Sequence, residues 1–235
     1  MFDKSSEKSW LTLAALALSI GWLLPNHHYP WTSFHSEAWI GVVLAAVIGV
    51  YMATQKGSTV LWSPLAVLTL AILAVPGLQY ALGILPFVGD AWIGTLFLSG
   101  LLISLLVGNL WQRTHPNQLG DFLFLAIGTA ALISVGLQLY QWFGFTHEAA
   151  PDQIWVYPLT SNRPYANLGQ PNQLSTLLIW GLLAGIWART RGYLSVPALA
   201  VYTALLILGL VLTQSRTAWL AITLLLLAVW HWRRC

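Results

Sequence analysis

Two arginines of this chain lie in polar stretches between apolar segments, and both are of a type that could bind an anion. Arg216 lies within LILGLVLTQSRTAWLAITLLLL, residues 206–227, where TQSR is the only polar interruption. A guanidinium is planar and always ionised, which suits a phosphate or pyrophosphate at the edge of a low-dielectric cavity. The alternative is an arginine that snorkels to the phosphates of the outer leaflet.

The second arginine, Arg163, lies near the end of the longest connection, residues 144–171. This connection runs into NRPYANLGQPNQL, where amide side chains are frequent and Pro171 is well placed to open a helix. Amides hydrogen-bond sugar hydroxyls without adding charge, and the N-terminus of a helix favours an anion. Ordinary capping and turn chemistry is the alternative explanation. The amides concerned are Asn162, Asn167, Gln170, Asn172 and Gln173.

The composition places these residues in an integral membrane protein. Hydrophobic residues make up 57% of the chain and charged residues 7%, whereas about a quarter of a soluble domain is charged. The Lys and Arg residues are scattered and form no basic surface for a phosphate backbone, so we expect no nucleic-acid partner. Cys235 is the single cysteine, which excludes an intramolecular disulfide and a Cys-x-x-Cys site.

Apolar segments of about the length needed to cross the hydrocarbon predict an all-α, polytopic fold with about eight transmembrane helices. One helix over 195–230 would measure about 54 Å, so the chain must turn at TQSR. We expect residues 1–235 to form a single transmembrane domain, with residues 144–171 as the loop between spans five and six. The predicted spans are 10–24, 36–54, 61–75, 91–110, 121–143, 172–188, 195–212 and 217–232.

The distribution of basic residues predicts the orientation. With eight spans, most Lys and Arg residues fall on the side of the N-terminus, which makes that side cytoplasmic by the positive-inside bias. Both termini are then cytoplasmic, and the opposite side receives only Arg163 and Arg216 among the basic residues. The cytoplasmic set is Lys4, Lys8, Lys56, Arg113, Arg189, Arg191, Arg233 and Arg234.

Two motifs on the same predicted side, RPYANLGQPNQLSTLL at 163–178 and LTQSRTAWLA at 212–221, resemble the O-antigen ligase superfamily. Within it, they are similar to the bacterial protein O-oligosaccharyltransferases that glycosylate pilins. The resemblance implies an inner-membrane glycosyltransferase that moves a glycan from an undecaprenyl-pyrophosphate-linked donor to a hydroxyl of a periplasmic acceptor such as pilin. It implies no cofactor and no metal. His27, His28 and His35 lack a nearby carboxylate and give no convincing metal site.

The resemblance also suggests roles for the polar residues. Charge develops on the departing pyrophosphate, and we expect Arg216 to offset it as the catalytic cation, with Arg163 as its partner. Gln170, Asn172 and Gln173 would position the donor or the acceptor. Gln214 and Ser215 would shape the turn and complete the substrate-binding set. His147 lies on the correct side for a general base, but nothing in the sequence places it near Arg216.

Family members are typically longer and carry a histidine important for transfer in a later periplasmic loop. The sequence therefore predicts the N-terminal part of a longer enzyme, able to bind donor lipid without transferring glycan by itself. A lipopolysaccharide O-antigen ligase or polymerase would use the same chemistry and stays open. So does a non-catalytic membrane subunit. A transporter would place ionisable groups inside the spans, which contain essentially none, although VPGLQYALGILPFVGD at 75–90 could form a re-entrant segment.

Overall fold

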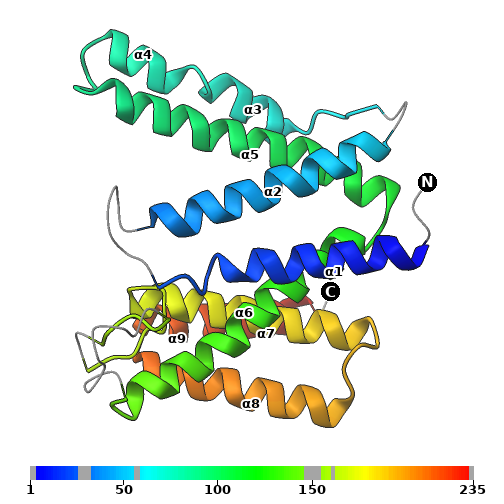
Figure 1. The fold of residues 1–235 in the computed structure, drawn as a ribbon, viewed down its shortest axis with the longest axis vertical. Helices are drawn as coiled ribbons and strands as arrows, with labels where there is room; N and C mark the ends of the chain where they lie inside the picture. The colour runs from blue at the N-terminus through cyan, green and yellow to red at the C-terminus, as the bar shows by residue number, and fades with distance from the viewer. Residues whose placement is uncertain (1–3, 26–32, 56–58, 146–154, 160–161, 233–235) are drawn as a thin grey trace. The chain divides into compact units, whose positions relative to one another are not determined.

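The computed structural model describes residues 4–25, 33–55, 59–145, 155–159 and 162–232, all of whose regular structure is α-helical (Figure 1). The all-α fold predicted from the sequence is confirmed. His27, His28, His147 and Cys235 lie outside the described residues. The helices are α1 (Lys4–Ile20), α2 (Phe34–Thr54), α3 (Pro64–Ile72), α4 (Val75–Ala81), α5 (Val88–Thr114), α6 (Gln118–Trp142), α7 (Pro171–Thr190), α8 (Val196–Thr213) and α9 (Arg216–Trp232).

Within the described part of the chain, five helical segments are long and apolar enough to cross a membrane: α2, the α3–α4 pair, α5, α6 and α8. The protein is therefore a multi-pass membrane protein. Shorter apolar stretches lie in α1 and α9. Each of the eight predicted spans coincides with a helix, but α1, α7 and α9 are not among the five. The count of eight stays a prediction.

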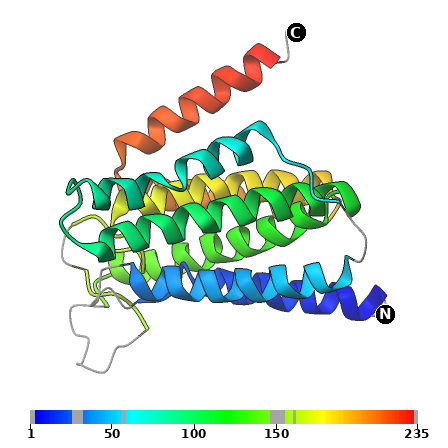
Figure 2. The same cartoon turned by 90° about the horizontal axis from the view of Figure 1, so that it is seen from above.

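The chain divides into two compact units, residues 47–119 and residues 1–46 with 120–235. In the smaller unit, α3 and α4 run back along α5 (Figure 2). Ser63 begins α3 by accepting a hydrogen bond from the Ala66 N–H at 3.1 Å, and Pro76 stands in the first turn of α4. The connection at 75–90 thus contains a short helix that continues the α3 hydrophobic segment.

In the larger unit, α6, α7 and α8 pack together because small residues let their backbones approach. Gly181 and Gly185 are four residues apart on α7, so they lie on one face, as in the small-xxx-small patterns of membrane helices. A Cβ on Gly181 would lie 2.6 Å from the Cβ of Ala131 on α6, and one on Gly185 would lie 2.8 Å from the ring of Tyr202 on α8. Tyr202 donates to the Gly181 carbonyl at 2.9 Å.

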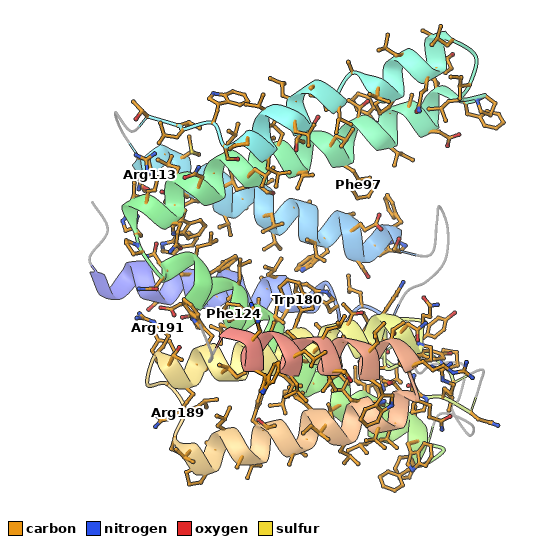
Figure 3. The ribbon with its side chains drawn as sticks, turned by 180° about the vertical axis from the view of Figure 1, so that it is seen from behind. Phe97, Arg113, Phe124, Trp180, Arg189 and Arg191 are labelled. Atoms are coloured by element: carbon orange, nitrogen blue, oxygen red, sulfur yellow. The ribbon has the colours of Figure 1, made fainter. Side chains whose placement is uncertain are left out.

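The two ends of this helix group differ in character. At the end where α6 begins and α7 finishes, Asp121 accepts hydrogen bonds from Trp187, Arg191 and Tyr193. The bond to Asp121 raises the pKa of Arg191 above its ordinary value. Arg189 lies at the same end (Figure 3). The other end gathers the finish of α6, the start of α7 and the α8–α9 turn, so Arg163 and Arg216 share it, as the sequence predicted.

Candidate functional site

The α8–α9 turn presents Arg216 as the first residue of a helix. Helix α8 finishes at Thr213, and Gln214 follows in the left-handed conformation with φ 50° and ψ 32°, its N–H bonded to the Val211 carbonyl at 3.1 Å. Glycine usually occupies such a helix end, because the left-handed region costs another residue about 1–2 kcal/mol. The turn predicted at TQSR is confirmed, with strain at the residue two positions before Arg216.

Ser215 fixes this turn against the start of α7. Its side chain is fully buried, and its hydroxyl donates to Asn172 Oδ1 at 2.9 Å. The hydroxyls of Thr217 and Ser175 lie 2.7 and 3.2 Å from Ser215 Oγ. Ser175 also donates to the Asn172 carbonyl at 2.8 Å. This cluster of three hydroxyls and the Asn172 amide sets the direction in which α9 and its first side chain leave the turn.

Arg163 reaches the same turn from the other side. Its half-buried side chain donates from Nε to the Thr213 carbonyl at 2.9 Å. The last carbonyls of a helix have no partner within the helix and carry its partial negative charge, so a cation is favourable there. Arg163 therefore has a defined structural role, connecting the 162–170 segment to the end of α8.

The remaining predicted residues are exposed at this end. Arg216 and Gln214 project from the turn, and among the described residues no side chain or backbone group pairs with the Arg216 guanidinium. Gln170 is the N-cap of α7 through its backbone, but its side chain makes no capping bond. Gln173 follows one turn into α7. Pro171 opens α7 as predicted.

Three buried amide side chains hold the segment that contains Arg163. The sequence had predicted no positioning role for them. Gln141, near the end of α6, is fully buried and makes four hydrogen bonds. Its Oε1 accepts from the N–H groups of Tyr165 and Ala166 at 3.0 and 2.7 Å, and its Nε2 donates to the carbonyls of Tyr157 and Ala166, both at 2.8 Å. Every hydrogen-bonding position of this amide is therefore used.

The other two amides extend the same frame. Gln138, one turn earlier on the same face of α6, donates to the Gly209 carbonyl of α8 at 3.0 Å and to the Pro164 carbonyl at 3.5 Å. Asn167 accepts from the Tyr157 N–H and donates to the carbonyls of Leu23 and Trp155. The sequence feature that could have indicated this role is a pair of glutamines three residues apart inside an apolar span, since polar side chains are rare within transmembrane helices.

The arrangement joins an exposed guanidinium to a rigid, hydrogen-bonded support at one end of a membrane helix group. In the described part of the chain, no group of three His, Cys, Asp or Glu residues is placed to hold a metal ion. The chemistry that these side chains can perform is the binding of an anion by Arg216 and of hydroxyl or amide groups by the exposed Gln170, Asn172 and Gln173.

The family described as protein glycosylation ligase matches residues 164–187, which include the end of the connection and most of α7. A general O-oligosaccharyltransferase of Acinetobacter baylyi is 29% identical over 215 residues, 89% of this chain. The chain is thus a relative of protein glycosylation ligases. A ComP-specific O-oligosaccharyltransferase of the same organism is 28% identical over 148 residues, 63% of the chain.

These relatives are enzymes of the glycosyltransferase type, and the resemblance predicted from the two motifs is confirmed. The matches cover only 36% and 26% of the two relatives' own lengths, so the chain spans about a third or less of the curated relatives that it matches. No solved structure matches the chain. The family match includes Gln170, Asn172 and Gln173 but ends before the turn that carries Arg216.

Proposed function

We propose that this chain forms the donor-binding part of a bacterial O-oligosaccharyltransferase. The donor is a glycan linked to undecaprenyl pyrophosphate, and the acceptor is a hydroxyl of a periplasmic protein such as pilin. The observation that carries the proposal is the position of Arg216. This exposed cation begins α9. The residue before it, the buried Ser215, is hydrogen-bonded to Asn172 on α7, the helix that the glycosylation-ligase family matches.

The surrounding helix ends support an anion at this position. Helices α7 and α9 both begin here, so the partial positive charges of two N-termini add to that of Arg216. Helix α8 finishes at the same end with the opposite partial charge, but Arg163 lies on its Thr213 carbonyl. The local field is therefore favourable for the pyrophosphate of a lipid-linked donor. Gln170, Asn172 and Gln173 contribute neutral hydrogen-bonding groups for sugar hydroxyls.

In the transfer that we propose, the oxygen of an acceptor hydroxyl forms a bond to the anomeric carbon of the glycan. The bond from that carbon to the pyrophosphate oxygen breaks, and the pyrophosphate leaves with the electron pair. Arg216 offsets the charge that develops on the leaving group, which stabilises the transition state more than the ground state. The proton of the hydroxyl passes to a general base, for which His147 stays a candidate outside the described residues.

The orientation that we propose follows the charges. The protein lies in the bacterial inner membrane with both termini cytoplasmic, so that the end containing Arg189 and Arg191 faces the cytoplasm. Residues 144–171 form a periplasmic loop between the fifth and sixth of eight spans in a single transmembrane domain. Arg216 then lies at the periplasmic surface, where lipid-linked donor and secreted acceptor can both reach it.

The test replaces Arg216 in the gene at its full natural length and returns it to a strain that lacks the gene but makes the donor and pilin. We expect Arg216→Ala to lower pilin glycosylation about 100-fold or more, as for the loss of one transition-state charge stabiliser. Arg216→Lys should recover little, because an ammonium cannot reproduce the guanidinium fork. Arg189→Ala, at the opposite end, is the matched control and should be neutral. Unchanged glycosylation by an Arg216→Ala protein present at normal levels would refute the pyrophosphate role.

A further inference from the structure

We infer that Gln141 is a positioning residue for the proposed donor site: by holding Ala166 in a left-handed conformation, it places Arg163 and the α8–α9 turn for donor binding. The inference rests on the proposed function, since it assigns a residue that prepares the same site without touching the donor. Gln141 lies within α6 and outside the segment that the glycosylation-ligase family matches.

Gln141 stabilises a strained backbone conformation at Ala166. Ala166 has φ 52°, a value that a residue with a Cβ adopts at a cost, and its side chain is fully buried. The Gln141 amide bonds both the N–H and the carbonyl of Ala166 and also the N–H of Tyr165. Such a backbone conformation persists only where several contacts determine it together, and here one side chain supplies three of them.

Hydrogen bonds connect the 163–166 segment to the end of α8 and so to the α8–α9 turn. Pro164, whose carbonyl is the more distant partner of Gln138, lies between Ala166 and Arg163. Gln138 also bonds the Gly209 carbonyl, one turn before Thr213, whose carbonyl accepts from Arg163. Gln141 thus holds the 163–166 segment to α6, while Gln138 and Arg163 bond α8 at two successive turns, at Gly209 and Thr213. If Ala166 leaves the left-handed region, the backbone of Arg163 turns with it, and the bond to Thr213 is lost.

Packing alone does not require an amide side chain at position 141. Polar side chains are costly within an apolar membrane helix, and a leucine of similar size would fill the same space. Of the three described non-glycine residues with a positive φ, Asn117, Ala166 and Gln214, the last two lie on the two segments that Arg163 joins. The Gln141 contacts are thus suited to holding one backbone geometry.

The first experiment measures position directly, without donor. In a Cys235→Ser background, spin labels at Asn162, beside Arg163, and at Thr190, at the far end of α7, report the distance between the segment and the helix. Both side chains are exposed. We expect a narrow distance distribution in the parent protein and a broad, shifted one in Gln141→Leu. Gln112→Leu, an exposed glutamine on α5, is the matched control. An unchanged distribution in Gln141→Leu would overturn the inference.

The second experiment measures binding of undecaprenyl pyrophosphate to the chain in lipid nanodiscs. Gln141→Leu should weaken binding about tenfold, because the net contribution of one hydrogen bond, here the lost bond from Arg163 to Thr213, is of that order. Adding Ala166→Gly should restore much of the affinity, since glycine adopts φ 52° without strain. If Gln141 only stabilised the fold, Gln141→Leu would lower the melting temperature, but the folded protein would keep its affinity. Ala166→Gly would then recover no affinity.

The two hypotheses fail in different ways. If Arg216→Ala binds undecaprenyl pyrophosphate as the parent does, the proposed function is wrong, whereas the distance measurement still tests Gln141. If Arg216→Ala loses binding and Gln141→Leu retains it despite a broadened distance distribution, the proposed function stands and the positioning role of Gln141 is refuted. Loss of binding in both variants, with recovery only of Gln141→Leu by Ala166→Gly, is the result that we expect.

Discussion

Replacing Gly181 with alanine should destabilise the helix group that carries the candidate site. The new Cβ would lie 2.6 Å from the Cβ of Ala131 and 3.0 Å from Cδ1 of Leu206. Carbon atoms in contact are separated by about 3.5–4.0 Å, so α6 and α7 must move apart by about 1 Å. The atom met on α6 is attached directly to the backbone, so no side-chain rotation can relieve the overlap. The hydrogen bond from Tyr202 to the Gly181 carbonyl would lengthen with that movement.

The magnitude follows from two opposing effects. Overpacking a tight contact costs about 1–3 kcal/mol, while replacing glycine within a helix gains up to about 1 kcal/mol. We therefore expect Gly181→Ala to lower the free energy of unfolding by about 1–2 kcal/mol. Gly136, on α6, is the matched control because a Cβ there meets nothing within 4 Å. Gly136→Ala should be neutral or slightly stabilising.

The assay is equilibrium unfolding in mixed micelles of a mild detergent and sodium dodecyl sulfate, followed by tryptophan fluorescence. Gly181→Ala should shift the midpoint to a lower fraction of dodecyl sulfate, and Gly136→Ala should not. If the two alanine variants unfold together at the midpoint of the parent, then α6 and α7 do not approach as closely as the Gly181 contacts require. The close packing of α6 against α7 at Gly181 would then be wrong.

Two further predictions concern the role of Arg163 and the orientation of the protein. Arg163→Lys should retain most pilin glycosylation, because an ammonium can still donate to the Thr213 carbonyl; a loss as deep as that of Arg216→Lys would instead make Arg163 a bidentate ligand of the pyrophosphate. In a Cys235→Ser background, Asn162→Cys should react with an impermeant maleimide in intact spheroplasts, whereas Arg189→Cys should react only after permeabilisation. Protection of Asn162 together with labelling of Arg189 would reverse the proposed orientation.

Most helix positions could be predicted from the sequence because membrane helices are long apolar runs with polar ends. The turn at Gln214 was predictable for the same reason, since one helix over both flanking runs would exceed the bilayer. The short α4 helix was not assigned as such, because Pro76 and Gly77 read as breakers. A proline in the first turn of a helix loses no intrahelical hydrogen bond. Pro76 therefore opens α4 and does not break it.

The candidate site was predictable only in part, because amino-acid type does not reveal which amides face inward. Asn172 belongs to the run of amides assigned to the substrate, and the structure shows its side-chain oxygen accepting from the buried Ser215. Gln138 and Gln141 lie within an apolar span, where their partners come from residues 16 to 71 positions further along the chain. No local pattern encodes such pairings, since they arise when α6, α7 and α8 pack.

The structure gives different environments to Arg163 and Arg216, which the sequence presents as similar anion-binding candidates. Arg163 is half-buried and lies on the last carbonyl of α8, where its charge is opposed by the end of a helix. Arg216 is exposed at the beginning of α9, where the helix adds to its charge. An anion is attracted by the sum of the side-chain charge and the partial charge of the helix end. The helix end therefore strengthens anion binding at Arg216 and weakens it at Arg163. The asymmetry is the physical reason for assigning the pyrophosphate to Arg216 and the framework of the site to Arg163.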